Sequence, residues 1–255
     1  SSKVNDYVKF NSRFIVGSQA NGGWASLNAG KENNTDNVQG ADGQADVSLS
    51  NAYFGFTAIP NTVVNIGKQG LTTPYTVAVD INGNEQTGTG ILALSTFGPV
   101  TAGLGYFNNT NLNASSEINL TQGLGLDNFP NGANGVINGG QDVYVATVQG
   151  DLDFVKLEAW YLGLQDTFGS YTLAATSNLD LAENAKLGLE ARYVQLTLND
   201  KVARTLTSDK NSMFRFAVDG KFSIVNARLA YTMTDKKGGL TALDQDAKNT
   251  SLGWA

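Results

Sequence analysis

The sequence of 255 residues contains no cysteine and no histidine. The absence of cysteine excludes disulfide scaffolds, thiolate zinc sites and cysteine nucleophiles. The absence of histidine excludes the Ser-His-Asp triad, imidazole metal sites and the commonest general base. An enzymatic function would therefore need chemistry without either residue, and we expect that the chain is not an enzyme.

Proline, methionine and charge are also scarce, with 4 prolines, 2 methionines and 16% charged residues. Lysine and arginine total 17 against 23 acidic residues, a formal charge of −6. This balance argues against nucleic acid as a partner, because nucleic-acid binders usually carry a basic face. No run of 18 apolar residues occurs, so the sequence predicts no transmembrane helix.

What the sequence does have is alternation with a period of two residues. In the segment 185–198, apolar residues at odd positions up to Tyr193 alternate with Lys186, Glu190 and Arg192. After Tyr193 the apolar residues change to even positions. The segments 8–16, 213–222 and 223–234 alternate in the same way, which predicts strands with one apolar and one polar face.

Fainter strand candidates bring the total to about 12, namely 47–59, 61–69, 87–97, 99–107, 142–150, 152–164, 168–178 and 249–255. Short links roughly alternate with long polar ones at 18–45, 70–86, 108–141, 199–210 and 235–248. Long strands with tight turns at one end and long loops at the other predict an all-β fold, a transmembrane antiparallel β-barrel. We expect one barrel domain over 1–255. A soluble β-sandwich or β-helix is the alternative, although no fixed-period repeat supports the β-helix.

Basic residues recur in mid-strand, opposite the apolar face. In a large barrel this face lines the water-filled lumen. The sequence therefore predicts a basic pore wall, made of Lys9, Arg13, Lys186, Arg192, Arg215 and Arg228. A solvated outer face of a sandwich would show the same pattern.

The segment 70–90 is too long for a turn and contains an apolar stretch at 75–79. It is a candidate for a loop folded into the lumen, where Asp80 and Glu85 would oppose the basic wall and sort ions by charge. An ordinary exposed loop is the equal alternative. Oxygen-bearing residues at 80–85 also resemble a calcium loop, but the EF-hand spacing is missing and turn residues explain the pattern. The segment with Leu240, Asp244 and Asp246 is a weaker metal candidate still, and no cofactor pattern is present.

Aromatic residues cluster near the ends of the candidate strands, as in the girdles of membrane barrels. The residues are Tyr7, Tyr53, Phe54, Phe56, Tyr106, Phe107, Trp160, Tyr161, Phe168, Tyr171 and Phe222. Core aromatics of a soluble domain would look similar, so they only support the barrel.

Short motifs give the chain a family resemblance. The segment VVNIGKQ at 63–69 is followed by TGTG at 87–90, GPVT at 98–101, GYFN at 105–108 and LEAWY at 157–161. Together they resemble the Campylobacter-type major outer membrane porin family. The resemblance covers most of the chain loosely, and its motifs are moderately specific.

The resemblance implies a trimeric barrel in the bacterial outer membrane, in contact with lipid and lipopolysaccharide, that passes ions and small hydrophilic solutes. It also implies that the loop after 68–69 constricts the pore, with Asp80 and Glu85 near the constriction. Such barrels normally end on a strand with a terminal aromatic residue, whereas this chain stops at Trp254-Ala255. At about 21 residues per strand, a 16- to 18-stranded porin needs about 340–380 residues. We therefore expect strands to be missing at the C-terminus, unless the barrel has 12 strands.

Passive diffusion through a water-filled barrel is the leading functional prediction. A non-conducting surface adhesin or envelope tether is the main alternative, motivated by the long polar loops. A soluble β-rich binding module, for instance for carbohydrate, is a third, and a barrel enzyme is the least favoured.

Overall fold

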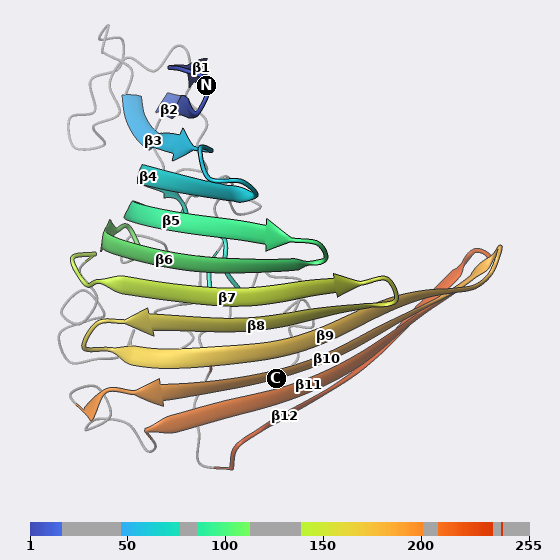
Figure 1. Cartoon of the computed structure of the whole chain (residues 1–255). Coiled ribbons are helices and arrows are strands. Elements are labelled where there is room, and N and C mark those ends of the chain that lie inside the picture. Colours follow the sequence, from blue (N-terminus) through green and yellow to red (C-terminus); the bar gives the residue numbers. More distant parts are fainter. Residues whose placement is uncertain (17–46, 77–85, 113–138, 201–208, 237–240, 242–255) are drawn as a thin grey trace, which may run out of the picture.

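The computed structural model describes residues 1–16, 47–76, 86–112, 139–200, 209–236 and 241. Within them, twelve strands form a single sheet (Figure 1). The strands are β1 (Ser2–Lys3), β2 (Val8–Val16), β3 (Val47–Phe56), β4 (Thr62–Gly70), β5 (Thr87–Phe97), β6 (Val100–Thr110), β7 (Val143–Leu152), β8 (Val155–Leu164), β9 (Phe168–Ala182), β10 (Ala185–Leu198), β11 (Lys210–Phe222) and β12 (Val225–Thr234). No described helix is long and apolar enough to span a membrane.

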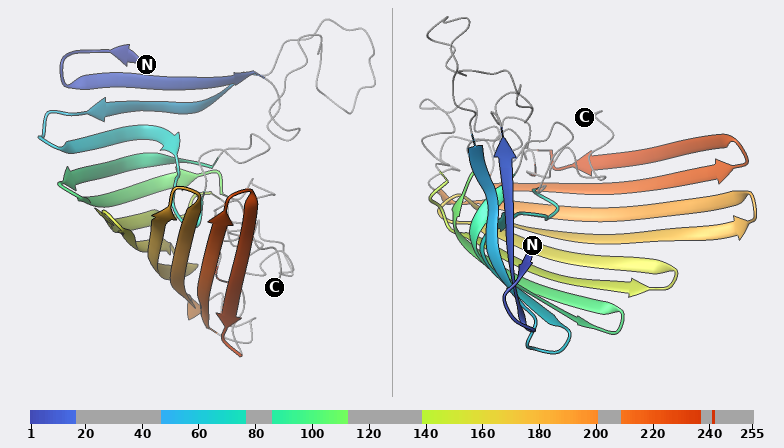
Figure 2. Two further views of the ribbon diagram at one scale, coloured as in Figure 1. Left: turned by 90° about the vertical axis from the view of Figure 1, so that its right-hand side faces the viewer. Right: turned by 90° about the horizontal axis from the view of Figure 1, so that it is seen from above.

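The sheet is a continuous antiparallel meander in which each strand pairs with the next, from β1 to β12. Among the described residues β12 does not pair with β1, so these strands form a curved wall (Figure 2). Strands of 9 residues, such as β4, to 15 residues, as in β9, make up this wall after β1. Tilted strands of about 9–11 residues are enough to cross a bilayer.

The predicted strand segments agree with this sheet in eleven cases. The prediction for 168–178 is too short, because β9 extends to Ala182. The sequence did not predict β1, a two-residue strand that pairs with β2. The predicted strand at 249–255 lies outside the described residues.

Tight turns join the strands at one end of the sheet. Two-residue links connect β5 to β6, β7 to β8 and β11 to β12, and their first residues are Gly98, Asp153 and Ser223. These residues have φ values of 56°, 47° and 53°. A positive φ at the first position matches the turn geometry that suits the twist of a hairpin. The local sequence therefore fixes the register of these three hairpins.

The outer, convex face of the sheet is apolar. One cross-strand row contains Val148, Leu173, Phe214 and Met233, and Val148 and Leu173 are 54% and 51% exposed. Large apolar side chains on the surface of a twelve-stranded sheet are what a lipid-facing wall requires.

Tyrosines gather on this face near the end that carries the long links. The rings of Tyr106 and Tyr144 lie 5.5 Å apart, and those of Tyr171 and Tyr193 lie 6.2 Å apart. Such a row is typical of a membrane interface, where the ring is in the apolar layer and the hydroxyl in water. Not every aromatic residue assigned to the girdles lies there, since Phe107, Trp160 and Phe168 belong to inner rows of the sheet.

The inner, concave face has its buried apolar cluster near the same end. A buried cluster there includes Phe107, Val143 and Leu162, together with Val194, Leu196 and Leu198 of β10. The change of apolar positions after Tyr193 is therefore not a slip of register, because β10 pairs with β11 without interruption. The inner face becomes apolar where the segment after β4 packs against it.

Candidate functional site

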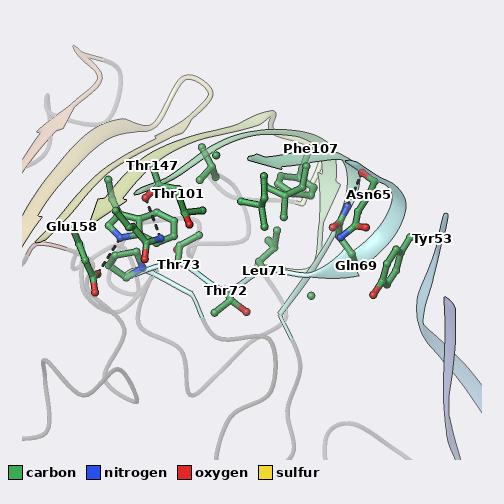
Figure 3. Close-up of a pocket in the computed structure, with 18 of the residues that line it drawn as sticks. Tyr53, Asn65, Gln69, Leu71, Thr72, Thr73, Thr101, Phe107, Thr147 and Glu158 are labelled. Carbon is green, nitrogen blue, oxygen red and sulfur yellow. Dashed lines mark hydrogen bonds between the residues drawn. The ribbon is translucent and has the colours of Figure 1, made fainter. Parts of the chain in front are cut away.

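The segment after β4 folds into the concavity of the sheet. Leu71 and Tyr75 belong to the buried inner cluster, with exposed fractions of 3% and 0%. A short turn with Pro74 is closed by a 3.0 Å bond from the backbone N–H of Thr73 to the carbonyl oxygen of Thr76. Proline favours such a turn because its ring fixes φ. We call residues 71–76 the inward loop, and Figure 3 shows its first residues beneath the arch of the sheet.

Tyr75 fixes the inward loop to a distant strand. Its hydroxyl lies 2.8 Å from Oγ of Ser170 and 2.6 Å from Oγ1 of Thr172, both on the inner face of β9. Burial raises the pKa of the Tyr75 phenol, although the two hydrogen bonds and the charge of Arg192 act in the opposite direction. The phenol therefore stays neutral at physiological pH.

A cavity of about 680 Å³ lies between the inward loop and the inner wall. Most of its polar lining consists of amides and hydroxyls, including Asn51, Asn65, Gln69, Thr101, Thr147 and Gln149. Its charged lining residues are Arg13, Lys156 and Glu158. Apolar side chains, among them Leu92, Phe107 and Trp160, make up the rest of the lining, so the cavity has a mixed surface, bounded by β-sheet on one side and by the loop on the other (Figure 3).

The charged part of the lining is ordered by short contacts. Nζ of Lys156 lies 2.9 Å from Oε1 of Glu158, and Nε1 of Trp160 donates a 3.2 Å hydrogen bond to Oε2 of Glu158. The two contacts hold the carboxylate at the cavity wall, where it presents a fixed negative charge beside a fixed positive one.

Charged residues also gather on the inner faces of β10, β11 and β12. Glu190 lies within 4 Å of Arg192, Arg215 and Arg228. Arg228 also lies 3.5 Å from Asp219. We call these five residues the arginine cluster. Arg192 and Arg215 are 4% and 2% exposed and are removed from solvent, whereas Arg228 and Asp219 are partly exposed.

The basic residues proposed from strand parity all lie on the inner face. Arg13 lines the cavity, and Lys9 belongs to the cross-strand row of Asn65. Lys186 is exposed and pairs with Asp180 at 2.9 Å. Arg192, Arg215 and Arg228 form the arginine cluster and are not among the residues that line the cavity. Asp80 and Glu85 lie outside the described residues, so their place at a constriction stays a prediction.

The pore wall predicted from the sequence contained basic residues only and omitted the acidic residues of the inner face. Glu158, Glu190 and Asp219 lie in mid-strand. Strand parity contained the signal for Glu190, because it precedes Arg192 by two residues and therefore shares its face. The partners of Tyr75 had no such signal.

The calcium question is untested, because the segment 80–85 lies outside the described residues. Within the part of the chain that the structure describes, no group of three or more acidic residues is placed to hold a metal ion.

Comparisons with known proteins agree with this architecture. The family model of the Campylobacter major outer membrane protein matches residues 1–251. No curated protein matches the chain. Among solved structures, OccD3 (OpdP) of Pseudomonas aeruginosa is 16% identical with a TM-score of 0.57, covering 76% of this chain and 45% of that one.

Two further structures from Pseudomonas aeruginosa are similar. OccK7 (OpdD) is 13% identical with a TM-score of 0.57, covering 75% of this chain and 47% of its own. The outer membrane protein OpdK is 13% identical with a TM-score of 0.56, and the match covers 76% of this chain and 49% of OpdK. The chain thus spans about half the length of these outer-membrane β-barrels and shares their fold. From the match over 1–251, the chain belongs to the Campylobacter major outer membrane protein family of the bacterial outer membrane.

Proposed function

We propose that the protein forms a water-filled channel for passive diffusion of ions and small hydrophilic solutes. The observation that carries this proposal is the cavity between the inward loop and the inner wall, which carries charged and polar side chains inside a sheet with an apolar outer face. Its volume of about 680 Å³ corresponds to about 20 waters at about 30 Å³ each. The family and fold imply a channel rather than an enzyme.

Selectivity in this proposal comes from the width of the passage and from the fixed charges on its wall. The inward loop narrows the lumen on one side, and Arg13, Lys156 and Glu158 place both signs of charge on the other. Asp80 and Glu85, which follow the inward loop in the sequence, would add negative charge near this narrow section. Lipid surrounds the apolar face, and we also propose contact with lipopolysaccharide and assembly as a trimer.

Single-channel recording in a planar bilayer with a salt gradient tests the proposal. We expect stable conductance steps, in multiples of three for a trimer, and a reversal potential that gives the sign of the selectivity. The double substitution D80N/E85Q should move that potential toward anions. A folded, heat-resistant protein that gives no steps would refute diffusion and favour the adhesin or tether.

A further inference from the structure

The wall of the cavity contains an indole ring that is held in a fixed orientation. Trp160 is partly buried and packs against the buried inner cluster, and it also lines the cavity. Its Nε1 donates a 3.2 Å hydrogen bond to Oε2 of Glu158. Because the N–H is bonded to the wall and part of the ring is packed, the surface that Trp160 presents to the cavity is apolar.

Hydroxyl and amide side chains surround this ring. Thr147 and Thr172 are the direct cross-strand neighbours of Trp160. Gln149 and Glu158 are paired in the next inner row, and Nε2 of Gln149 donates a 3.3 Å hydrogen bond to Oγ1 of Thr147. An amide has a second N–H and a carbonyl oxygen to offer, so donors and acceptors lie beside an apolar ring surface.

The inward loop bounds the same part of the cavity. The hydroxyl of Tyr75 lies 2.6 Å from Oγ1 of Thr172, the neighbour of Trp160, which brings the turn before Tyr75 close to the ring. Thr73 and Pro74 of this turn line the cavity, and Figure 3 shows Thr73 on the loop side. We call this part of the cavity the indole site, lined by Thr73, Pro74, Thr147, Gln149, Lys156, Glu158 and Trp160.

The indole site carries no net formal charge. Its two charged groups are Lys156 and Glu158, and Nζ of Lys156 lies 2.9 Å from Oε1 of Glu158. Arg13, the third charged residue of the cavity, is on β2, six strands from β8 in the order of the sheet. An ion of either sign would be attracted by one partner of the pair and repelled by the other, and would also lose hydration. A neutral solute does not bear this cost.

We propose that the indole site binds neutral sugars. A sugar ring has hydroxyl groups at its edge and C–H groups on its faces, which matches a wall with hydrogen-bonding side chains around an apolar ring. The C–H face packs on Trp160, and hydroxyls exchange hydrogen bonds with Gln149 and Thr147. The volume of about 680 Å³ is ample for a monosaccharide. The inference rests on the proposed channel function and assigns it a class of solute.

Binding of methyl β-glucoside to the purified full chain in detergent tests the site. Saturation-transfer NMR should detect the glucoside on the wild-type protein, with the largest transfer to the protons of one C–H face. Sorbitol, which has hydroxyl groups but no ring, should bind much more weakly, and the anion glucuronate should bind no better than the glucoside. Equal binding of sorbitol would overturn the proposal, and so would tighter binding of glucuronate, because the site would then recognise charge.

Substitutions locate the bound sugar. W160L should weaken binding about fivefold or more, because it removes the ring, and Q149A should weaken it by a similar factor through a lost hydrogen bond. W160F keeps an aromatic ring and should have a smaller effect, and it tests the site even if W160L does not fold. The matched control is Y161L, since Tyr161 is the next residue of β8 and lies on the outer face beside Tyr171. Equal weakening in Y161L and W160L would overturn the assignment.

Conductance separates this inference from the channel function. Millimolar methyl β-glucoside should reduce the wild-type single-channel current in potassium chloride, whereas sorbitol at the same concentration should not. The reduction, relative to each variant's own current, should be smaller in W160L and unchanged in Y161L. Normal conductance with no glucoside binding would overturn the sugar site and leave the channel intact. Glucoside binding that depends on Trp160, in a protein without conductance, would support the site and refute the channel alone.

Discussion

The hydroxyl of Tyr75 lies 2.6 Å from Oγ1 of Thr172, a residue 97 positions further along the chain. This contact joins the inward loop, which leaves β4, to β9 on another part of the wall. Because Tyr75 is fully buried, its hydroxyl has no bulk water as an alternative partner. The position of the loop in the lumen therefore depends on this contact and on the apolar cluster around it.

The substitution Y75F should loosen the inward loop, while the phenyl ring still fills the place of Tyr75 in the buried apolar cluster. Loss of the hydroxyl removes the bonds to Ser170 and Thr172, while Oγ of Ser170 keeps its hydrogen bond to the carbonyl oxygen of Gln195. We expect a loss of stability of about 1 kcal/mol and noisier or larger single-channel currents. The control is Y171F, which removes a hydrogen bond to Gln195 on the outer face. Equal current noise in both variants would contradict the role of Tyr75.

Alkaline titration should detect the environment of Tyr75. Burial raises its pKa above the ordinary value, which is about 10, so the folded protein holds this proton more tightly than the unfolded chain does. Its contribution to stability is complete below about pH 10 and falls as the pH rises from there toward the folded pKa. Tyrosinate absorbance should contain a late phase that Y75F lacks. An identical titration of both proteins would show that the phenol is not buried.

Adjacent residues of β7 test which face meets lipid. Val148 is on the outer face and half exposed, whereas Gln149 lines the cavity. We expect V148R to cost about 2–4 kcal/mol, the penalty for arginine on a lipid-facing wall. The variant Q149R should fold normally and change the reversal potential. Urea unfolding in lipid, followed by tryptophan fluorescence, measures the stability of both variants, and single-channel recording measures the reversal potential of Q149R. If Q149R were less stable than V148R, the assignment of the two faces of the sheet would be wrong.

Gly90 allows a close approach of two strands. A Cβ at this position would meet the carbonyl oxygen of Tyr106 and lie 2.6 Å from Cα of Phe107, at a register shift between β5 and β6. Because both contacts are backbone, G90A should lower the free energy of unfolding by more than about 2 kcal/mol. At Gly150 the nearest neighbour is a side-chain carbon at 3.9 Å, so G150A should be tolerated. A stable G90A protein would mean that the bulge can rearrange.

The strands could be predicted from the sequence because each one shows a local pattern of alternation or ends at a recognisable turn. Alternation in β10, β11 and β12 gave both the strand and its polar face, and the turn at Gly98-Pro99 marked a hairpin. The faces of the aromatic residues were predicted less well, because Trp160 and Phe168 were assigned to the girdles yet face inward. Parity, not proximity to a strand end, decides which face a side chain occupies.

The candidate site was predictable only in part. Strand parity placed Arg192, Arg215 and Arg228 on the inner face, but not around Glu190. Their meeting depends on the pairing of three strands, whose register brings Arg192 opposite Arg215. A period-two pattern contains no information about which residues of neighbouring strands are opposite each other.

The sequence by itself determined the strands, their two faces and the ends that carry tight turns, because these follow from local alternation and turn chemistry. Only the tertiary structure decided that residues 71–76 fold inward, since the alternative of an exposed loop was equally compatible with the sequence. The reason is that Tyr75 gains its burial and its hydrogen bonds from β9, far along the chain. Such contacts between distant segments form when the sheet curves and brings its inner face around the loop.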